Sequence, residues 1–112
     1  MSLDIGLRMN LDTGGKEPYE VRLYSSNYTG NVWPMWEMSG CGDALYESDG
    51  KLASEIIPDL EHALPHMKAN PDDYRALNPS NGWGNYEGAM DFVAQLLTAC
   101  KEHPKASVWV WV

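Results

Sequence analysis

Hydrophobic and polar residues alternate along the first part of the chain, in a pattern typical of strands with one buried face. Residues 3–11 carry apolar side chains at odd positions and polar side chains or glycine at even positions. Residues 19–24 repeat the alternation, with Tyr24 on the polar side, and the turn-forming residues 12–15 lie between the two segments. Because successive side chains of a strand point to opposite faces, these segments predict an antiparallel hairpin.

Further along the chain the apolar spacing changes from two residues to three and four, which is the spacing of helices with one buried face. It predicts a helix over residues 54–67 with Ser54 as its cap. Pro65 removes a backbone donor inside this helix, so we expect a bend there or a helix that stops and restarts. A second helix is predicted over residues 85–101, beginning at Asn85 or just before it.

Shorter helical segments are predicted in two places. Asn31 is a suitable cap for a short helix over residues 34–38, which the following glycines end. Residues 71–77 allow another helical turn or two after the long helix. The next stretch, residues 78–88, is rich in asparagine and glycine and is expected to form an ordered loop.

The last segment, ASVWVWV over residues 106–112, alternates again but has apolar side chains on both faces. We expect its valines, Val108, Val110 and Val112, to join the buried face of the hairpin. Trp109 and Trp111 then share the opposite face with polar residues of the hairpin. The order strand, strand, helices, strand predicts a single α+β domain over residues 1–112, with a small antiparallel-rich sheet of about three strands and helices packed on one face.

The charge and composition of the chain narrow the classes of partner. The net charge is −8, with eight lysines and arginines against sixteen acidic residues, which argues against binding to a phosphate backbone. The sequence contains neither an apolar run of bilayer length nor a signal peptide, so we expect a cytoplasmic protein with no membrane partner. In that compartment Cys41 and Cys100 are expected to be free thiols.

Two stretches, NYTGNVWPMW at residues 27–36 and residues 70–106, resemble a family of small uncharacterised proteins from bacteriophages and their bacterial hosts. NGWGNYEGA is the most specific part of the resemblance, which covers most of the chain. It implies a compact cytoplasmic or phage-borne domain and no established activity. Trp33 stands where the family has a small polar residue, and Trp109 and Trp111 stand where it has smaller ones. On that pattern three of the five tryptophans are additions, which suits an engineered variant.

No motif in the chain identifies a catalytic or metal centre. The glycines of GWGNYEG follow no apolar strand, so they do not form a dinucleotide fingerprint. His62 and His66 share a helix face with Asp59 and Glu55, but the H-E-x-x-H arrangement is absent. Pro65 disturbs the spacing and no cysteine cluster is nearby, so a solvated helix face is favoured over a metal site. Cys41, between glycines, has no histidine placed nearby in sequence to activate it. We therefore expect a protein that is not an enzyme and has no cofactor and no bound metal.

The aromatic residues carry the functional hypotheses. Trp83 is expected to fold back and anchor its loop, and Trp36 to point into the core. Trp109 and Trp111, and further Trp33 with Met35, would form an exposed aromatic patch of the kind found at protein interfaces. The first hypothesis is a non-enzymatic protein-binding domain, natural or engineered, with a protein partner or a second copy in a homodimer on these residues.

The alternative hypothesis is a protein that binds or sequesters a small, nucleotide-like ligand. Asparagine amides and aromatic rings of two loops would form hydrogen bonds with the ligand and stack on it. The candidate residues are Asn27, Tyr28, Asn31, Asn81, Trp83, Asn85 and Tyr86.

Overall fold

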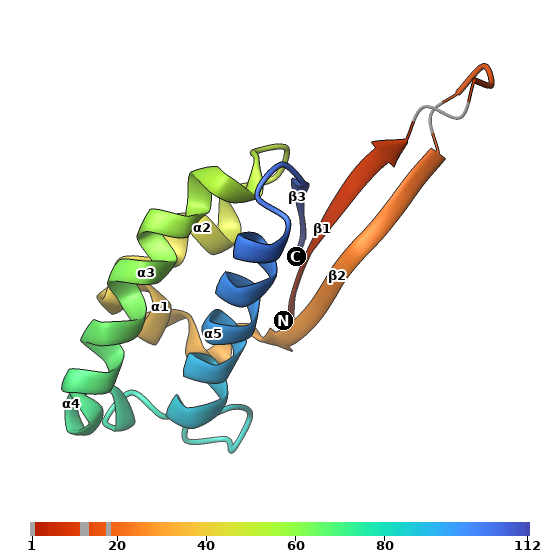
Figure 1. The fold of residues 1–112 in the computed structure, drawn as a ribbon. Helices are drawn as coiled ribbons and strands as arrows, with labels where there is room; N and C mark the ends of the chain where they lie inside the picture. The colour runs from red at the N-terminus through yellow and green to blue at the C-terminus, as the bar shows by residue number, and fades with distance from the viewer. Residues whose placement is uncertain (1, 12–13, 18) are drawn as a thin grey trace.

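The computed structural model describes residues 2–11, 14–17 and 19–112, and it contains one three-stranded antiparallel sheet. The strands are β1 (Ser2–Leu11), β2 (Tyr19–Thr29) and β3 (Ser107–Trp111), and β1 lies between the other two (Figure 1). The predicted α+β class and the hairpin are confirmed. Asp12 and Thr13 of the predicted turn lie outside the described residues.

Five α-helices and one short 3₁₀ helix follow the hairpin, and they cover a single face of the sheet (Figure 1). The longest are α3 (Ala53–Ala69) and α5 (Tyr86–Glu102), which pack against each other, and α5 also contacts β1 and β2. The shorter ones are η1 (Gly30–Val32), α1 (Trp33–Ser39), α2 (Gly42–Tyr46) and α4 (Pro71–Arg75). No helix in the described part of the chain has the length and apolar character needed to cross a membrane.

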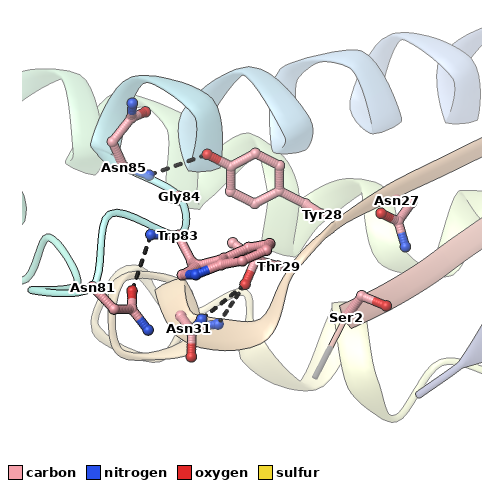
Figure 2. Close-up of a pocket in the computed structure, with 9 residues that line it drawn as sticks. All are labelled: Ser2, Asn27, Tyr28, Thr29, Asn31, Asn81, Trp83, Gly84 and Asn85. Carbon is pink, nitrogen blue, oxygen red and sulfur yellow. Dashed lines mark hydrogen bonds between the residues drawn. The ribbon is translucent and has the colours of Figure 1, made fainter.

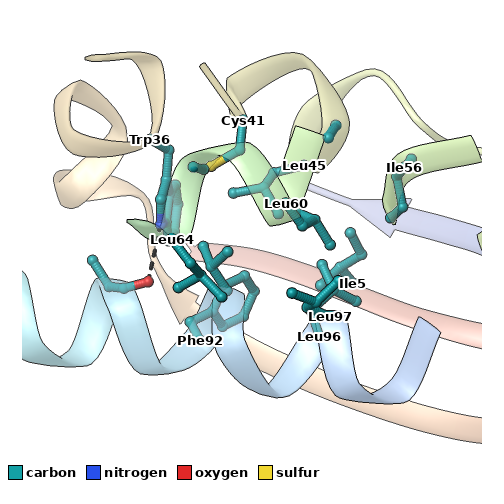
Figure 3. Close-up of a cluster of buried hydrophobic side chains, with 14 of the residues drawn as sticks. Ile5, Trp36, Cys41, Leu45, Ile56, Leu60, Leu64, Phe92, Leu96 and Leu97 are labelled. Atoms are coloured by element: carbon teal, nitrogen blue, oxygen red, sulfur yellow. Dashed lines mark hydrogen bonds between the residues drawn. The ribbon is translucent and has the colours of Figure 1, made fainter. Parts of the chain in front are cut away.

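The core lies between the sheet and the helices (Figure 3). Leu3, Ile5 and Leu7 of β1 and Val108 of β3 are fully buried beneath the helices, as their alternation predicted. Full burial of each such side chain contributes about 1.5–3 kcal/mol to folding. The expectation for Val112 was wrong, because this residue follows the last paired position of β3 and is exposed.

The structure moves two of the predicted helix caps and confirms a third. Thr29, rather than Asn31, caps the 3₁₀ turn before α1, and its hydroxyl accepts a hydrogen bond from the Asn31 N–H at 3.3 Å. The cap of α3 is Leu52 rather than Ser54, because the Glu55 carboxylate accepts the Leu52 N–H at 2.7 Å. The prediction for α5 is confirmed, because the Asn85 side chain accepts from the Gly88 N–H at 2.7 Å.

A β-bulge at Leu23 changes which side chains of β2 face the helices. Leu7 lies opposite Tyr24, whereas Arg8 lies opposite Arg22, so Leu23 is an extra residue with no counterpart on β1. Tyr24 therefore shares the helix-covered face with Leu7, and the prediction that it lies on the face of Glu20 and Arg22 was wrong. An extra residue reverses the alternation without altering the residue types, so the sequence pattern does not reveal it.

The outer edges of β2 and β3 differ. Residues 48–52 run along the edge of β3: Gly50 donates to the Val108 carbonyl at 2.8 Å and Val108 donates to the Lys51 carbonyl at 2.7 Å. The Val110 N–H donates to the Asp49 carboxylate at 2.9 Å. Within the described ranges, β2 has no backbone partner other than β1. The sheet therefore has one covered edge and one open edge.

Candidate functional site

A pocket of about 760 Å³ lies between the end of β2 and the loop that precedes α5 (Figure 2). We call it the Trp83 pocket. It brings together most residues of the small-ligand hypothesis, although β2 and the loop are more than fifty positions apart in sequence. The lining residues are Ser2, Asn27, Tyr28, Thr29, Asn31, Asn81, Trp83, Gly84 and Asn85.

Side-chain hydrogen bonds to the backbone hold the walls of the Trp83 pocket in place (Figure 2). The Tyr28 hydroxyl accepts the Asn85 N–H at 3.1 Å, which joins β2 to the loop. The Asn81 side chain accepts the Trp83 N–H at 2.9 Å and closes a local turn. Gly84 has a φ of +90°, and a Cβ atom there would lie 2.5 Å from Thr29 Cγ2 at the end of β2. Only glycine lets the loop approach β2 so closely.

The side chains that line the pocket are uncharged, and they retain both donors and acceptors for a ligand. The Asn81 and Asn85 carbonyl oxygens accept backbone N–H groups, which leaves their amide N–H groups facing solvent. The Asn27 side chain donates to the Asp4 carboxylate at 2.7 Å, and the Asn31 side chain donates to the Thr29 hydroxyl at 3.1 Å. These bonds use the amide nitrogens, so the amide oxygens of both residues can accept hydrogen bonds from a ligand. The amide groups of Asn31 and Asn81 lie on the side of the Trp83 ring, whereas the Asn85 side chain points away from the rings toward α5 (Figure 2).

Trp83 does not anchor its loop, contrary to the prediction. Its side chain is 67% exposed and lies at the mouth of the pocket (Figure 2). The loop is instead held by the asparagine side chains and by the close approach at Gly84. These interactions fix the backbone without the indole, so the ring remains accessible for stacking.

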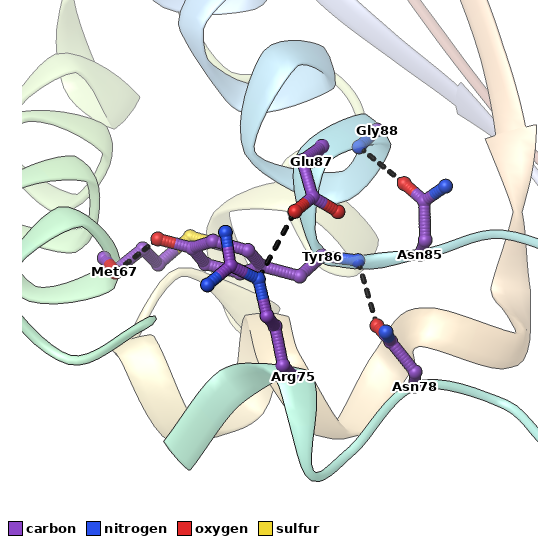
Figure 4. A network of polar contacts seen from close by, with 7 residues as sticks. All are labelled: Met67, Arg75, Asn78, Asn85, Tyr86, Glu87 and Gly88. Atoms are coloured by element: carbon purple, nitrogen blue, oxygen red, sulfur yellow. Dashed lines mark hydrogen bonds and ion pairs between the residues drawn. The ribbon is translucent and has the colours of Figure 1, made fainter. Parts of the chain in front are cut away.

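Tyr86 is the one residue of the small-ligand set that the structure places elsewhere (Figure 4). Its side chain is buried beside α3, and its hydroxyl donates to the Met67 carbonyl at 2.6 Å. The Tyr86 N–H donates to Asn78 at 2.8 Å, and the Arg75 guanidinium lies 5.2 Å from the centre of the ring. Tyr86 therefore holds the loop to the helices and does not face the pocket.

Two residues of the proposed protein interface are not exposed anchors. Met35 is fully buried, because α1 turns this side chain toward the core. Trp33 is half-buried and packs edge-on against Tyr46, with ring centres 4.6 Å apart. Trp36 points into the core as predicted, and its indole N–H donates to the Ala89 carbonyl at 3.2 Å.

Trp109 and Trp111 lie on the sheet face opposite the helices, which we call the open face. Trp109 pairs with Gly6, and its ring lies so close that a Cβ atom at Gly6 would come within 2.5 Å of the indole. The Arg22 guanidinium lies 5.5 Å from the centre of the same ring. Trp109 is therefore half-buried by its own sheet, whereas Trp111 is 72% exposed. A shallow hollow of about 610 Å³ surrounds both indoles, and Asp4, Arg8, Glu20, Arg22, Asp49 and Val110 complete its lining.

The remaining chemical candidates are engaged in the fold. Burial raises the pKa of the Cys41 thiol to about 11, so this thiol is protonated near neutral pH and is not an activated nucleophile. His66 Nδ1 and the Tyr74 hydroxyl share a hydrogen bond of 2.5 Å. In the parts of the chain that the structure describes, no three histidine, cysteine, aspartate or glutamate side chains gather in a way that could hold a metal ion.

Comparison with family models, curated proteins and solved structures gives no match to this chain. The resemblance to small phage and bacterial proteins and the origin of the three tryptophans therefore stay predictions. The functional argument depends on the geometry of the Trp83 pocket and the open face.

Proposed function

We propose that this protein binds a small, uncharged ring compound in the Trp83 pocket. The observation that carries the proposal is the combination of an exposed indole with amide donors and acceptors in one pocket (Figure 2). An exposed aromatic ring offers stacking to a flat or puckered ring, and the amides offer hydrogen bonds to its polar edge. Sugars, nucleobases and nucleosides have this chemistry.

The charge of the site favours uncharged ligands over phosphorylated ones. None of the lining side chains is a lysine or arginine, and the chain as a whole has a net charge of −8. Phosphate groups are bound in proteins by cationic side chains or by clusters of backbone N–H groups. The proposal therefore narrows the nucleotide-like ligand of the sequence hypothesis to its uncharged counterparts.

Substitution of Trp83 tests the proposal. Monosaccharides, nucleosides and the matching nucleotides would be screened by NMR of the labelled protein, and affinities would be measured for the compounds that shift the Asn81 and Asn85 amide signals. Loss of stacking in Trp83→Ala should weaken binding at least about fivefold, since base stacking on aromatic side chains contributes ~1–3 kcal/mol. Because the indole is exposed, the free energy of unfolding should change by no more than about 0.5 kcal/mol.

Trp111→Ala is the matched control, because Trp111 is an equally exposed tryptophan on the open face. It should leave ligand affinity unchanged. Equal affinity in the parent and in Trp83→Ala would contradict the proposal, as would tighter binding of nucleotides than of nucleosides.

The open face supports a second candidate function, the binding of a protein partner. The specific observation is the hollow in which Trp109 and Trp111 lie among residues of both charges. Tryptophan and arginine are enriched among the residues that dominate binding at protein interfaces. A photo-crosslinking residue at position 112 would identify the partner, and binding would then be measured with both purified proteins. Trp111→Ala should weaken that complex by about 2 kcal/mol, and an unchanged affinity would exclude this face as the interface.

A further inference from the structure

The β1–β2 hairpin extends beyond the helices as an arm, formed by residues 8–11 and 19–22 (Figure 1). The molecule is correspondingly elongated, with dimensions of 53 × 26 × 18 Å. Its radius of gyration is 15.0 Å, whereas a compact chain of this length has one of about 13 Å. The helices therefore leave the end of the hairpin uncovered.

Beyond the pair that Arg8 forms with Ser107 of β3, the arm is a strand pair that lacks a third strand. Apolar side chains of the arm remain accessible, with exposed fractions of 36% for Met9, 48% for Leu11 and 64% for Tyr19. These residues continue the face that the helices bury elsewhere in the sheet. The outer edge of β2 has no backbone partner among the described residues, and such an edge is a template for pairing with another strand.

The charge of the arm differs from that of the rest of the molecule. Residues 8–22 contain three basic and three acidic residues, so the net charge of −8 comes entirely from the remainder of the chain. Two copies would repel each other through their helical parts, whereas their arms can approach without net repulsion. The arm is thus the electrostatically favoured place for contact between identical chains.

We propose that β2 pairs with β2 of a second copy, antiparallel and with the two-fold axis at Val21. In this register Glu20 of each copy lies opposite Arg22 of the other, which gives two complementary charge pairs. Axes at Glu20 or at Arg22 would instead place identical charges opposite each other, which destabilises a strand pair. The charge sequence Glu20-Val21-Arg22 is therefore complementary to itself in only one of these three registers.

The joined sheet has six strands and keeps the helices of both copies on the same side. The helical parts lie at opposite ends of the joined sheet, because the paired strands run in opposite directions. Within each copy Glu20 already lies 3.8 Å from Arg8 and 3.9 Å from Arg22, and all three side chains are well exposed. The charged side chains are thus on one face and accessible for pairing across the axis.

Charge reversal tests the register directly, with the association constant measured by sedimentation equilibrium. Glu20→Arg places two pairs of arginines opposite each other, and Arg22→Glu places two pairs of glutamates, so each variant should dimerise at least about tenfold more weakly than the parent. The double variant Glu20→Arg/Arg22→Glu restores opposite charges and should dimerise like the parent. An equimolar mixture of the two single variants should form a heterodimer.

Arg75→Glu is the matched control, because Arg75 also forms an exposed ion pair, with Glu87 at 3.1 Å, and lies over an aromatic ring. It should dimerise like the parent. A parent protein that stays monomeric at every accessible concentration would overturn the proposal. Single variants that dimerise like the parent would also overturn it, as would a mixture without heterodimer. Formation of the heterodimer by Glu20→Arg and Arg22→Glu excludes misfolding as the cause of weak dimerisation of each variant alone. None of these substitutions lies in the Trp83 pocket, so its ligand binding tests the proposed function separately.

Discussion

At the level of single residues, the Tyr86 hydroxyl is the contact that joins the start of α5 to the end of α3. It donates to the Met67 carbonyl, which lies in the last turn of α3, where carbonyl groups have no partner within the helix. The ring stacks on Tyr74, with centres 5.9 Å apart. One side chain therefore satisfies a helix end and fixes the neighbouring loop.

Tyr86→Phe should lower the free energy of unfolding by about 1–2 kcal/mol, because the Met67 carbonyl stays buried without its donor. Urea denaturation followed by circular dichroism measures the change. Ligand affinity at the Trp83 pocket should stay the same, since Tyr86 faces away from it. Tyr19→Phe is a suitable control, because the Tyr19 ring is exposed. The free energy of unfolding of this variant should equal that of the parent. Equal stability of Tyr86→Phe and the parent would show that the hydrogen bond contributes nothing.

At the level of elements, α3 runs from Ala53 to Ala69 as one helix, although it contains Pro58 and Pro65. Of the two alternatives expected at Pro65, a helix that stops and restarts was wrong, and a bend at this position stays a prediction. Its apolar stripe, which includes Leu60, Leu64 and Met67, is buried against α5 and the rest of the core. Packing along the whole stripe outweighs the two backbone hydrogen bonds that the prolines remove, because tertiary contacts supply most of the stability of a helix in a protein.

Pro65→Ala should therefore raise the free energy of unfolding by about 1 kcal/mol or more. The substitution restores a backbone donor within α3, and the gain exceeds the loss of the proline's restraint on the unfolded chain. The side chain is exposed, so no core contact is lost. Thermal unfolding compares the variant with the parent. A lower midpoint for the variant would indicate that α3 bends at this position in a way that its packing requires.

The sequence predicted correctly those elements whose apolar residues recur with the two-residue period of a strand or the 3.6-residue period of a helix. The alternation in β1 and β3 and the stripe of α5 gave both the element and its buried face. The face of Tyr24 was not predictable, because the bulge at Leu23 depends on the pairing of β2 with β1. The exposure of Trp83 was not predictable either, because the loop is held by its backbone, through the Asn81 side chain and the distant Tyr28 hydroxyl, and not by the indole.

At the level of the whole molecule, buried thiols couple stability to alkaline pH. Burial raises the pKa of Cys41 and of Cys100 to about 11 in the folded protein, from a usual value of 9.0. Between these values the unfolded chain releases protons that the folded protein retains, so rising pH favours unfolding. Below pH about 9 the thiols are protonated in both states and contribute no pH dependence.

The free energy of unfolding, measured with urea at a series of pH values, should therefore fall between pH about 9 and about 11. Burial also raises the pKa of Tyr24, Tyr46 and Tyr74, which act in the same direction. Cys100→Ala should show a shallower fall than the parent over this range. Constant stability up to pH about 11 would mean that the thiols reach solvent in the folded protein.

The bulge at Leu23 also determines which single-residue deletions in β2 leave the fold intact. Leu23 is the residue of β2 without a counterpart on β1, so its deletion leaves an unbroken ladder in which every other side chain keeps its face. Deletion of Ser25 instead shifts the register of β2 by one residue on one side of the deletion. The side chains of either the arm or the Tyr28 end of β2 then point to the opposite face of the sheet. A protein lacking Leu23 should still fold. A protein lacking Ser25 should lose either the hydrogen bond between the Asn85 N–H and the Tyr28 hydroxyl or the alignment of apolar side chains along the arm.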